Sequence, residues 1–322
     1  AIITSAILIS MVLVVIFPII TWVPYASPIF LIPLILSVFG LYQTTYTPLS
    51  VEEWDYIQLN APDNPRSLDN VKRVKNVNKQ KYSLSNSQKP SGAVRIIQIT
   101  DPHLGTMMSI SRLQTICEQA VLLKPDIVLL TGDFYTVEGY ERSQHALAEG
   151  LKPLRELKGK LFACIGNHDK EHCARERTEE DLKLTGATFL VGEEASIQLD
   201  VGTVKIIGLD FFRPSATRTN HINHVMNNSC PPGVDDALRI VMLHDPGAFH
   251  LLPDQKNMVF SGHTHGGQFG LLSLGINLTL VQMAGIPDQG LFEKASNLLY
   301  VHRAHGCRSA LGTMMVRLGC PP

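Results

Sequence analysis

Five apolar segments of this chain are each followed at once by Asp, Asn or His, and this pattern limits the possible folds more than any other feature. The segments and the residues after them are 94–100 with Asp101 and His103, 126–131 with Asp133, 161–165 with Asn167 and His168, 238–243 with His244, and 258–261 with His263 and His265. Short apolar runs are typical of buried strands. Ligand sites in α/β folds gather at the carboxyl ends of strands, so we expect an α/β protein whose site contains these side chains.

The segments between and after these strands support the same fold class. Apolar residues recur at helical spacing from Leu113 to Val121, and residues 143–157 also favour a helix. Further strands are predicted at 195–199, 204–209, 298–302 and 312–318.

The polar residues at the strand ends have the chemistry of metal ligands. Taken singly, each has an ordinary explanation as a helix cap, a turn residue or a loop histidine. Asp, Asn and His together supply the oxygen and imidazole ligands that suit Mn²⁺, Fe or Zn²⁺ without a thiolate. In the Gly-His-Thr-His-Gly-Gly-Gln stretch at 262–268, His263 and His265 either share one face of a strand or, at a turn, point at two neighbouring ions.

The motifs Asp-x-His, Gly-Asp, Gly-Asn-His-Asp, a single His after an apolar strand, and Gly-His-Thr-His together resemble the calcineurin-like metallophosphoesterase superfamily. The resemblance runs from residue 95 to the C-terminus. It implies a sandwich of two mixed β-sheets flanked by helices, with two divalent metal ions that are expected to be Mn²⁺, with Fe or Zn²⁺ as alternatives. It also implies roles for eight residues: Asp101, His103 and His265 at one ion, Asn167, His244 and His263 at the other, Asp133 as the bridge, and His168 as the general acid.

Two departures from the family pattern bear on the substrate. Phe134 and Tyr135 follow the Gly-Asp motif where the protein phosphatases have an Asp-Arg pair, which disfavours a phosphoprotein substrate. His305 stands in an Arg-Ala-His-Gly stretch where relatives have Arg-Gly-Leu-Gly. It is either a residue that faces the substrate or an ordinary loop histidine.

The N-terminal part of the chain contains no Asp, Glu, Lys or Arg before Glu52. Residues 2–20 are almost wholly apolar and long enough to cross a bilayer. The second apolar run, 29–42, contains Pro33 and either crosses or re-enters the membrane. We therefore expect a membrane-anchoring transmembrane helical hairpin at 1–49, with a cleaved signal peptide as the alternative.

A basic segment follows the apolar hairpin. Residues 50–91 are expected to form a linker, either solvated or held against anionic lipid, and residues 92–322 to form the metallophosphoesterase domain. Basic residues beside a membrane segment favour the cytoplasmic face, here of the inner membrane. A formal net charge of −1 gives no reason to expect nucleic acid as a partner, and no obligate protein partner is evident. The six scattered cysteines are expected to be reduced thiols.

Two stretches are expected to decide the substrate. Residues 211–230 are predicted to be irregular, and residues 270–292 are unusually apolar, either as core packing or as a groove for acyl chains. Within the superfamily the chain is most similar to a bacterial membrane-associated branch, the chlamydia-type UDP-2,3-diacylglucosamine pyrophosphatases of lipid A synthesis. This resemblance implies a lipid-linked nucleotide substrate that is cleaved to UMP and 2,3-diacylglucosamine 1-phosphate. The alternatives are a general membrane-tethered phosphodiesterase, a phospholipid phosphatase and a non-catalytic scaffold. The soluble enzymes for this step have Arg where this chain has His168.

Overall fold

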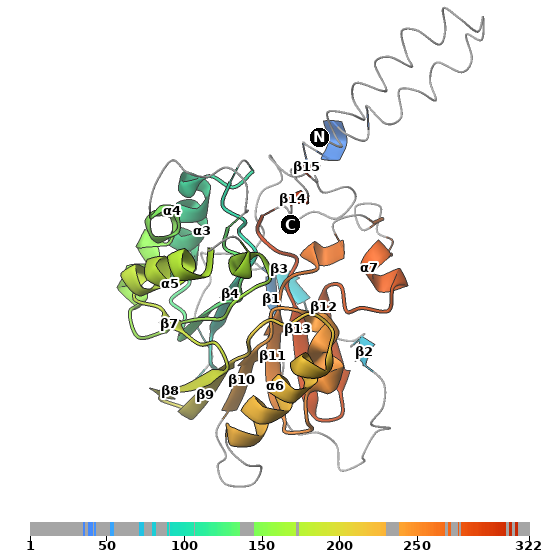
Figure 1. Ribbon diagram of the computed structural model, residues 1–322. Helices are drawn as coiled ribbons and strands as arrows, with labels where there is room; N and C mark the ends of the chain where they lie inside the picture. Colours follow the sequence, from blue (N-terminus) through green and yellow to red (C-terminus); the bar gives the residue numbers. More distant parts are fainter. Residues whose placement is uncertain are drawn as a thin grey trace, which may run out of the picture.

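A computed structural model gives the structure of the chain (Figure 1). It describes residues 91–105, 107–135, 145–171, 174–229, 238–267 and 278–306, and shorter stretches at 35, 38–40, 42, 52–54, 71–73, 79–81, 89, 270–271, 276, 309–310 and 313–314. The fold is α/β, with two main β-sheets that are flanked by helices.

The smaller main sheet has the strand order β4-β5-β6-β7 and is parallel in every described pair. Its strands are β4 (Ile96–Ile99), β5 (Ile127–Leu130), β6 (Leu161–Ala163) and β7 (Thr188–Phe189). The helices α3 (Ile110–Leu122), α4 (Ala146–Gly150) and α5 (Ala174–Thr185), with the 3-10 helix η2 (Lys152–Leu157), lie on its outer face. Ser109 caps the N-terminus of helix α3, since its hydroxyl accepts a hydrogen bond from Arg112 N at 3.1 Å.

The larger sheet has seven strands in the order β2-β12-β13-β11-β10-β9-β8 and is mixed. Its strands are β2 (Lys72–Arg73), β8 (Glu193–Leu199), β9 (Gly202–Gly208), β10 (Leu238–Met242), β11 (Asn257–Ser261), β12 (Gly290–Lys294) and β13 (Asn297–Val301). Strands β9, β10, β11 and β13 are parallel neighbours, and β2, β8 and β12 pair antiparallel at the edges. Helix α6 (Ala216–Asn228) and the 3-10 helix η4 (Pro246–Leu251) cover its outer face.

Apolar residues on both faces of the strands build three layers of core. On β5, Ile127 and Leu129 face the larger sheet, whereas Val128 and Leu130 face the helices. On β10, Ile240 and Met242 lie in the core between the sheets, and Val241 packs toward α6. The four layers are helices, sheet, sheet and helices, so each sheet is covered on both faces. Because successive side chains of a strand point to opposite faces, the central strands of such a sheet need apolar residues on both faces.

Three sequence expectations change in the structure. Residues 216–228, expected to be irregular, form α6, which is capped by Ser215 and buries Ile222, Val225 and Met226. The helix expected at 143–157 is divided, since α4 ends at Gly150 and η2 begins at Lys152. The segment expected as a linker contributes β2 to the larger sheet, where Arg73 pairs with Phe292 of β12.

The expected membrane hairpin lies outside the described residues, apart from the helical residues 35, 38–40 and 42. Within the described part of the chain, every helix is too short or too polar to span a membrane. The two short ladders β1 (Glu52–Trp54) with β3 (Lys79–Lys81), and β14 (Ser309–Ala310) with β15 (Thr313–Met314), are antiparallel.

Candidate metal centre

The loops after the central strands of both sheets meet at one end of the sandwich. Asp101 N donates to Gly132 O at 3.0 Å, and His103 N donates to Asp133 O at 3.1 Å, so the loops after β4 and β5 run side by side. In the larger sheet, Gly262 N donates to His244 O at 3.1 Å and joins the loops after β10 and β11. The carboxyl ends of the strands in both sheets therefore supply one site.

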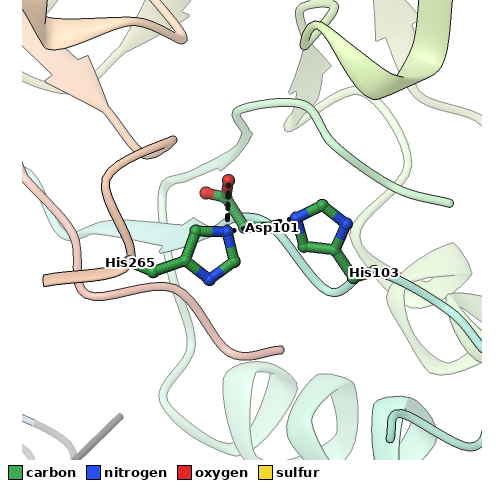
Figure 2. A group of neighbouring side chains, drawn as sticks. All are labelled: Asp101, His103 and His265. Carbon is green, nitrogen blue, oxygen red and sulfur yellow. Dashed lines mark hydrogen bonds and ion pairs between the residues drawn. The ribbon is translucent and has the colours of Figure 1, made fainter. Parts of the chain in front are cut away.

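Asp101, His103 and His265 form the first triad of the site (Figure 2). Each offers a ligand atom, all three atoms lie within 4.8 Å of one another, and all three residues are buried. The Nε2 atoms of His103 and His265 are 3.1 Å apart, and His265 Nε2 lies 3.6 Å from Asp101 Oδ1. Two ring nitrogens at this distance need a proton or a cation near them.

Asp133, His244 and His263 form the second triad, again with ligand atoms within 4.8 Å of one another. His244 Nε2 is 3.2 Å from Asp133 Oδ2. The same carboxylate oxygen is 3.6 Å from His103 Nε2 of the first triad, so Asp133 lies between the two groups. The His244 Nδ1 atom is 2.7 Å from Thr131 O, and a carbonyl only accepts, so Nδ1 donates and Nε2 faces the site.

Asn167 and His168 lie beside the second triad. His168 N donates to Asp133 Oδ1 at 2.8 Å. The Asn167 Oδ1 and His168 Nε2 atoms are buried without a hydrogen-bond partner among the described residues. The His168 Nδ1 atom donates to Glu171 Oε2 at 3.1 Å, and the His168 ring meets that of His103 edge-on, with centroids 5.2 Å apart. The unpaired oxygen and nitrogen are free to contact a ligand in the site.

Five of these residues have left-handed backbone conformations. The φ angles are 48° at Asp101, 46° at His103, 54° at Asp133, 67° at His263 and 54° at His265. A positive φ is uncommon for residues other than glycine and turns the side chain away from the direction of the preceding strand.

Two glycines allow the carboxylates to come close to the neighbouring backbone. A Cβ at Gly262 would lie 2.0 Å from Asp101 Oδ2, and a Cβ at Gly166 would lie 2.2 Å from Asp133 Oδ1. The Asp101 carboxylate occupies this space and accepts hydrogen bonds from His263 N and from the Thr100 hydroxyl, the latter at 2.6 Å.

Asp169 ties together the loops that carry the second triad. Its buried carboxylate accepts three backbone N–H groups, from Asp133 at 2.7 Å, Phe134 at 2.8 Å and Gly166 at 2.9 Å. A carboxylate that accepts several backbone donors fixes them in one arrangement. Asp169 therefore positions Asp133 without itself belonging to either triad.

The buried charges of the site are mutually dependent. Burial raises the pKa of the Asp101 carboxyl to about 7, against the opposing effect of the positive charge of His244. Burial alone would also raise the pKa of Asp133, but the charge and hydrogen bond of His244 outweigh it and hold that pKa well below its usual range. Burial disfavours the charged form of His244, yet the Asp133 carboxylate raises its pKa to about 10.

These features fit divalent cations in both triads. The carboxylates of Asp101 and Asp133 are almost inaccessible to water, where charged groups are stable only with a counter-charge. The ligand atoms are carboxylate oxygens and imidazole nitrogens, which suit Mn²⁺, Fe or Zn²⁺. The described cysteines of the core, Cys117 and Cys164, belong to neither triad.

The segment after β9 borders the second triad. The Phe211 ring lies 6.2 Å from the His244 ring and 6.1 Å from the His263 ring, centroid to centroid. Lys170 Nζ donates to Phe211 O and Asp210 Oδ1, each at 2.8 Å. Arg218 of α6 pairs with Asp245, the residue after His244, at 2.8 Å. These contacts fix the wall of the site beside the second triad.

His305 approaches the first triad from the backbone side. Its N–H donates to Thr100 O at 3.1 Å, and Gly306 N donates to Asp101 O at 2.9 Å. Its ring stacks on that of His302 with centroids 4.6 Å apart. Of the two interpretations of His305, these contacts favour a loop residue that supports the Asp101 turn.

The structure thus brings all eight residues predicted from the strand ends into one region. Sequence reasoning gave no role to Asp169 and Glu171, which hold those residues, whereas Phe211 belongs to the 211–230 stretch that was expected to border the substrate. Both lie in the 166–171 stretch, Asp169 directly after His168 and Glu171 three residues after it, and this proximity to His168 was the available signal.

Known proteins share this sequence pattern. The sequence profile of the calcineurin-like phosphoesterases matches residues 94–267. A protein of Caenorhabditis elegans that is named as a metallophosphoesterase is 30% identical over 227 residues, which are 68% of this chain and 45% of that protein. The UDP-2,3-diacylglucosamine pyrophosphatase of Chlamydia trachomatis is 28% identical over 71% of this chain and 81% of that protein. A transmembrane protein with a metallophosphoesterase domain from Danio rerio is 29% identical over 56% of this chain and 42% of that protein.

Proposed function

Since the chain belongs to the calcineurin-like phosphoesterase family and is therefore a metal-dependent hydrolase, we propose that it cleaves the pyrophosphate of a lipid-linked nucleotide. The proposed substrate class follows that of the Chlamydia trachomatis relative, UDP-2,3-diacylglucosamine. Hydrolysis would give UMP and 2,3-diacylglucosamine 1-phosphate, a step of lipid A synthesis.

The observation that carries the proposed hydrolysis at two cations is the position of Asp133 Oδ2, which is 3.2 Å from His244 Nε2 of one triad and 3.6 Å from His103 Nε2 of the other. Asp101, His103 and His265 would hold one cation, and His244, His263 and Asn167 the other, with Asp133 shared. Two divalent cations in such a site neutralise charge on a phosphoryl group and lower the pKa of bound water.

The protein's own contribution to bond cleavage is assigned to His168. Its Nε2 atom is buried and has no hydrogen-bond partner among the described residues, so it can donate a proton to the oxygen of the leaving group. The Glu171 carboxylate accepts from Nδ1 at 3.1 Å, which orients the ring. The Phe211 ring lies beside the second triad, 6.2 Å from the His244 ring.

We also propose that residues 1–49 anchor the catalytic domain, 92–322, to the inner membrane on its cytoplasmic side, with residues 50–91 between them. The absence of charged residues before Glu52 and the basic residues that follow support this proposal. In sealed vesicles of known orientation, a protease on the periplasmic side should leave the catalytic domain intact. Digestion from that side would reverse the proposed orientation.

The test is a product analysis with the purified full-length chain, Mn²⁺ and UDP-2,3-diacylglucosamine in ¹⁸O-labelled water. We expect UMP and 2,3-diacylglucosamine 1-phosphate in equal amounts, with ¹⁸O in one of them only, which identifies the phosphorus that is attacked. Asp133→Ala should abolish turnover, because it removes the carboxylate between the triads. Asp200→Ala, at an exposed turn between β8 and β9, is the matched control and should keep full activity.

The same assay separates the alternative functions. Release of phosphate from a phospholipid, with the UDP-lipid intact, would favour a phospholipid phosphatase. Cleavage of many simple diesters at similar rates would favour a general phosphodiesterase. A chain that binds no divalent cation and cleaves none of these compounds would be a scaffold, and the proposed function would be wrong.

A further inference from the structure

An apolar surface segment follows the second histidine motif. Six of the large apolar side chains between residues 270 and 286 are exposed: Leu271, Ile276, Leu278, Leu280, Met283 and Ile286. Leu280 is 61% exposed and Met283 is 70% exposed. No Asp, Glu, Lys or Arg occurs from residue 266 to residue 287. Contiguous exposed apolar surface of this kind marks a region that contacts a partner or a membrane.

The described residues of this segment form a compact unit. Leu271 N donates to Leu278 O at 2.9 Å, and Ile276 N donates to Leu271 O at 3.2 Å. Thr279 caps the short helix α7 (Leu280–Met283), since its side chain accepts from Gln282 N at 3.0 Å. These hydrogen bonds join described backbone groups of the segment around α7 (Figure 1), and its apolar side chains at Leu280 and Met283 are exposed.

The base of the segment packs against the metal-site loop. The Thr279 hydroxyl donates to Asp288 Oδ2 at 2.9 Å, and the Thr264 hydroxyl, between His263 and His265, donates to Asp288 O at 2.6 Å. A Cβ at Gly267 would lie 2.4 Å from Thr279 Cβ, so the Thr279 side chain lies against the Gly267 backbone. The position of the apolar surface is therefore fixed relative to the first triad.

The chemistry of this surface matches a lipid bilayer more closely than a protein partner. Protein interfaces surround an apolar centre with a polar rim, whereas the segment has no charged side chain over its whole length. The first 51 residues of the same chain are also uncharged, and the described residues Ile35, Val38, Phe39 and Tyr42 among them are exposed. A chain with this N-terminal sequence holds its catalytic domain close to lipid.

We propose that the described residues of this segment, 270–271, 276 and 278–286, lie on the surface of a lipid bilayer, with Leu280 and Met283 inserted among the acyl chains. The loop that carries His263 and His265 then faces the membrane, where a lipid-linked substrate is held by its own acyl chains. The bilayer contact stands independently, and its link to the substrate rests on the proposed function.

The contact can be measured without any hydrolysis. Met283→Trp in the full-length chain is reconstituted into phosphatidylcholine and phosphatidylglycerol vesicles whose acyl chains are brominated. A side chain at the headgroup boundary lies about 5–10 Å deep, so the added tryptophan emission should shift to shorter wavelength and fall by about half. The unsubstituted chain supplies the background from Trp22 and Trp54.

Leu122→Trp is the matched control, because Leu122 is 63% exposed but lies on α3, outside this segment. Its emission should not be quenched. Equal quenching at both positions, or none at Met283→Trp, would overturn the inference. If the emission of Met283→Trp instead shifts to shorter wavelength equally in unbrominated and brominated vesicles while the chain is dimeric, a second copy of the chain covers the surface. This result also overturns the inference.

A second pair of variants links the surface to turnover. Leu280→Ser with Met283→Ser should lower kcat/KM for a bilayer-embedded UDP-lipid by roughly tenfold and leave a soluble nitrophenyl diester unaffected. Leu122→Ser with Leu184→Ser, on the opposite layer, should change neither rate. Quenching without lipid turnover would leave the bilayer contact intact and reject the proposed substrate, whereas lipid turnover without quenching would reject the contact alone.

Discussion

Replacing Asp169 with Asn tests whether a residue outside both triads controls the metal centre. Asp169 Oδ2 accepts from Asp133 N and Gly166 N, and Oδ1 accepts from Phe134 N. If the Asn amide oxygen takes the place of Oδ2, the bonds from Asp133 N and Gly166 N are kept. The amide nitrogen then faces the Phe134 N–H, and two donors cannot form a hydrogen bond. The loss of one bond to a charged acceptor and the unsatisfied donor together cost about 2–4 kcal/mol of the free energy of unfolding.

The lower half of that range is the better expectation for Asp169→Asn. Burial and the nearby charge of Asp133 raise the pKa of Asp169 to about 6, so removing the carboxylate also relieves part of a repulsion. For a domain of this size the loss corresponds to a fall in Tm of roughly 5–10 °C. The displaced Asp133 backbone should weaken divalent cation binding by about 10- to 100-fold.

Thermal unfolding followed by circular dichroism and calorimetric titration with Mn²⁺, both in detergent, measure the two effects. The matched control is Asp126→Asn, because Asp126 lies at the other end of β5 and accepts from Arg95 N at 2.7 Å. This control should lower the Tm but leave the Mn²⁺ affinity unchanged. Asp169→Asn with the parent affinity for Mn²⁺ would refute the argument that this carboxylate holds Asp133 in place.

Three further predictions concern the same site. Gly262→Ala should lower the number of divalent cations bound per chain, counted by metal analysis, because its Cβ would lie 2.0 Å from Asp101 Oδ2. Gly159→Ala, with nothing within 4 Å of its Cβ, should bind as many cations as the parent. Glu171→Gln should slow turnover by about tenfold for an alkyl leaving group but not for a nitrophenolate, since only the former needs the proton of His168; equal losses would contradict this role. Burial raises the pKa of Asp101 to about 7, so cation binding near neutral pH must displace a proton from this carboxyl. The affinity for Mn²⁺ should therefore rise from about pH 6 to about pH 8, with proton release measured by calorimetry. An affinity that is independent of pH would contradict this prediction.

The strands and the residues at their ends could be predicted because their signal is local. An apolar run such as 127–130, buried on both faces, has few other structures available to it, and the polar residue that follows marks its end. The position of Asp133 between the two triads depends instead on bonds with Asp169 and His168, which are 36 and 35 residues away, and no local pattern contains such bonds.

Two elements were missed because long-range contacts stabilise them. Most residues of helix α6 are polar. Its residue Arg218 donates a hydrogen bond to Asp245, which lies 27 residues further along the chain. Strand β2 consists of Lys72 and Arg73 within a basic stretch, with no apolar pattern to reveal it. Arg73 nevertheless bonds Asp288 and lies 4.6 Å from the centre of the Phe292 ring, contacts across more than 200 residues.

The left-handed backbone at Asp101, His103, Asp133, His263 and His265 has a consequence for how such a chain can change over generations. Each of these conformations disfavours folding by about 1–3 kcal/mol in a residue other than glycine. A lineage that used the domain only as a scaffold would gain stability whenever one of the five mutated to glycine, and drift would remove the ligands one by one. Asp and His at these five positions are therefore expected to persist only in lineages that use the side chains themselves.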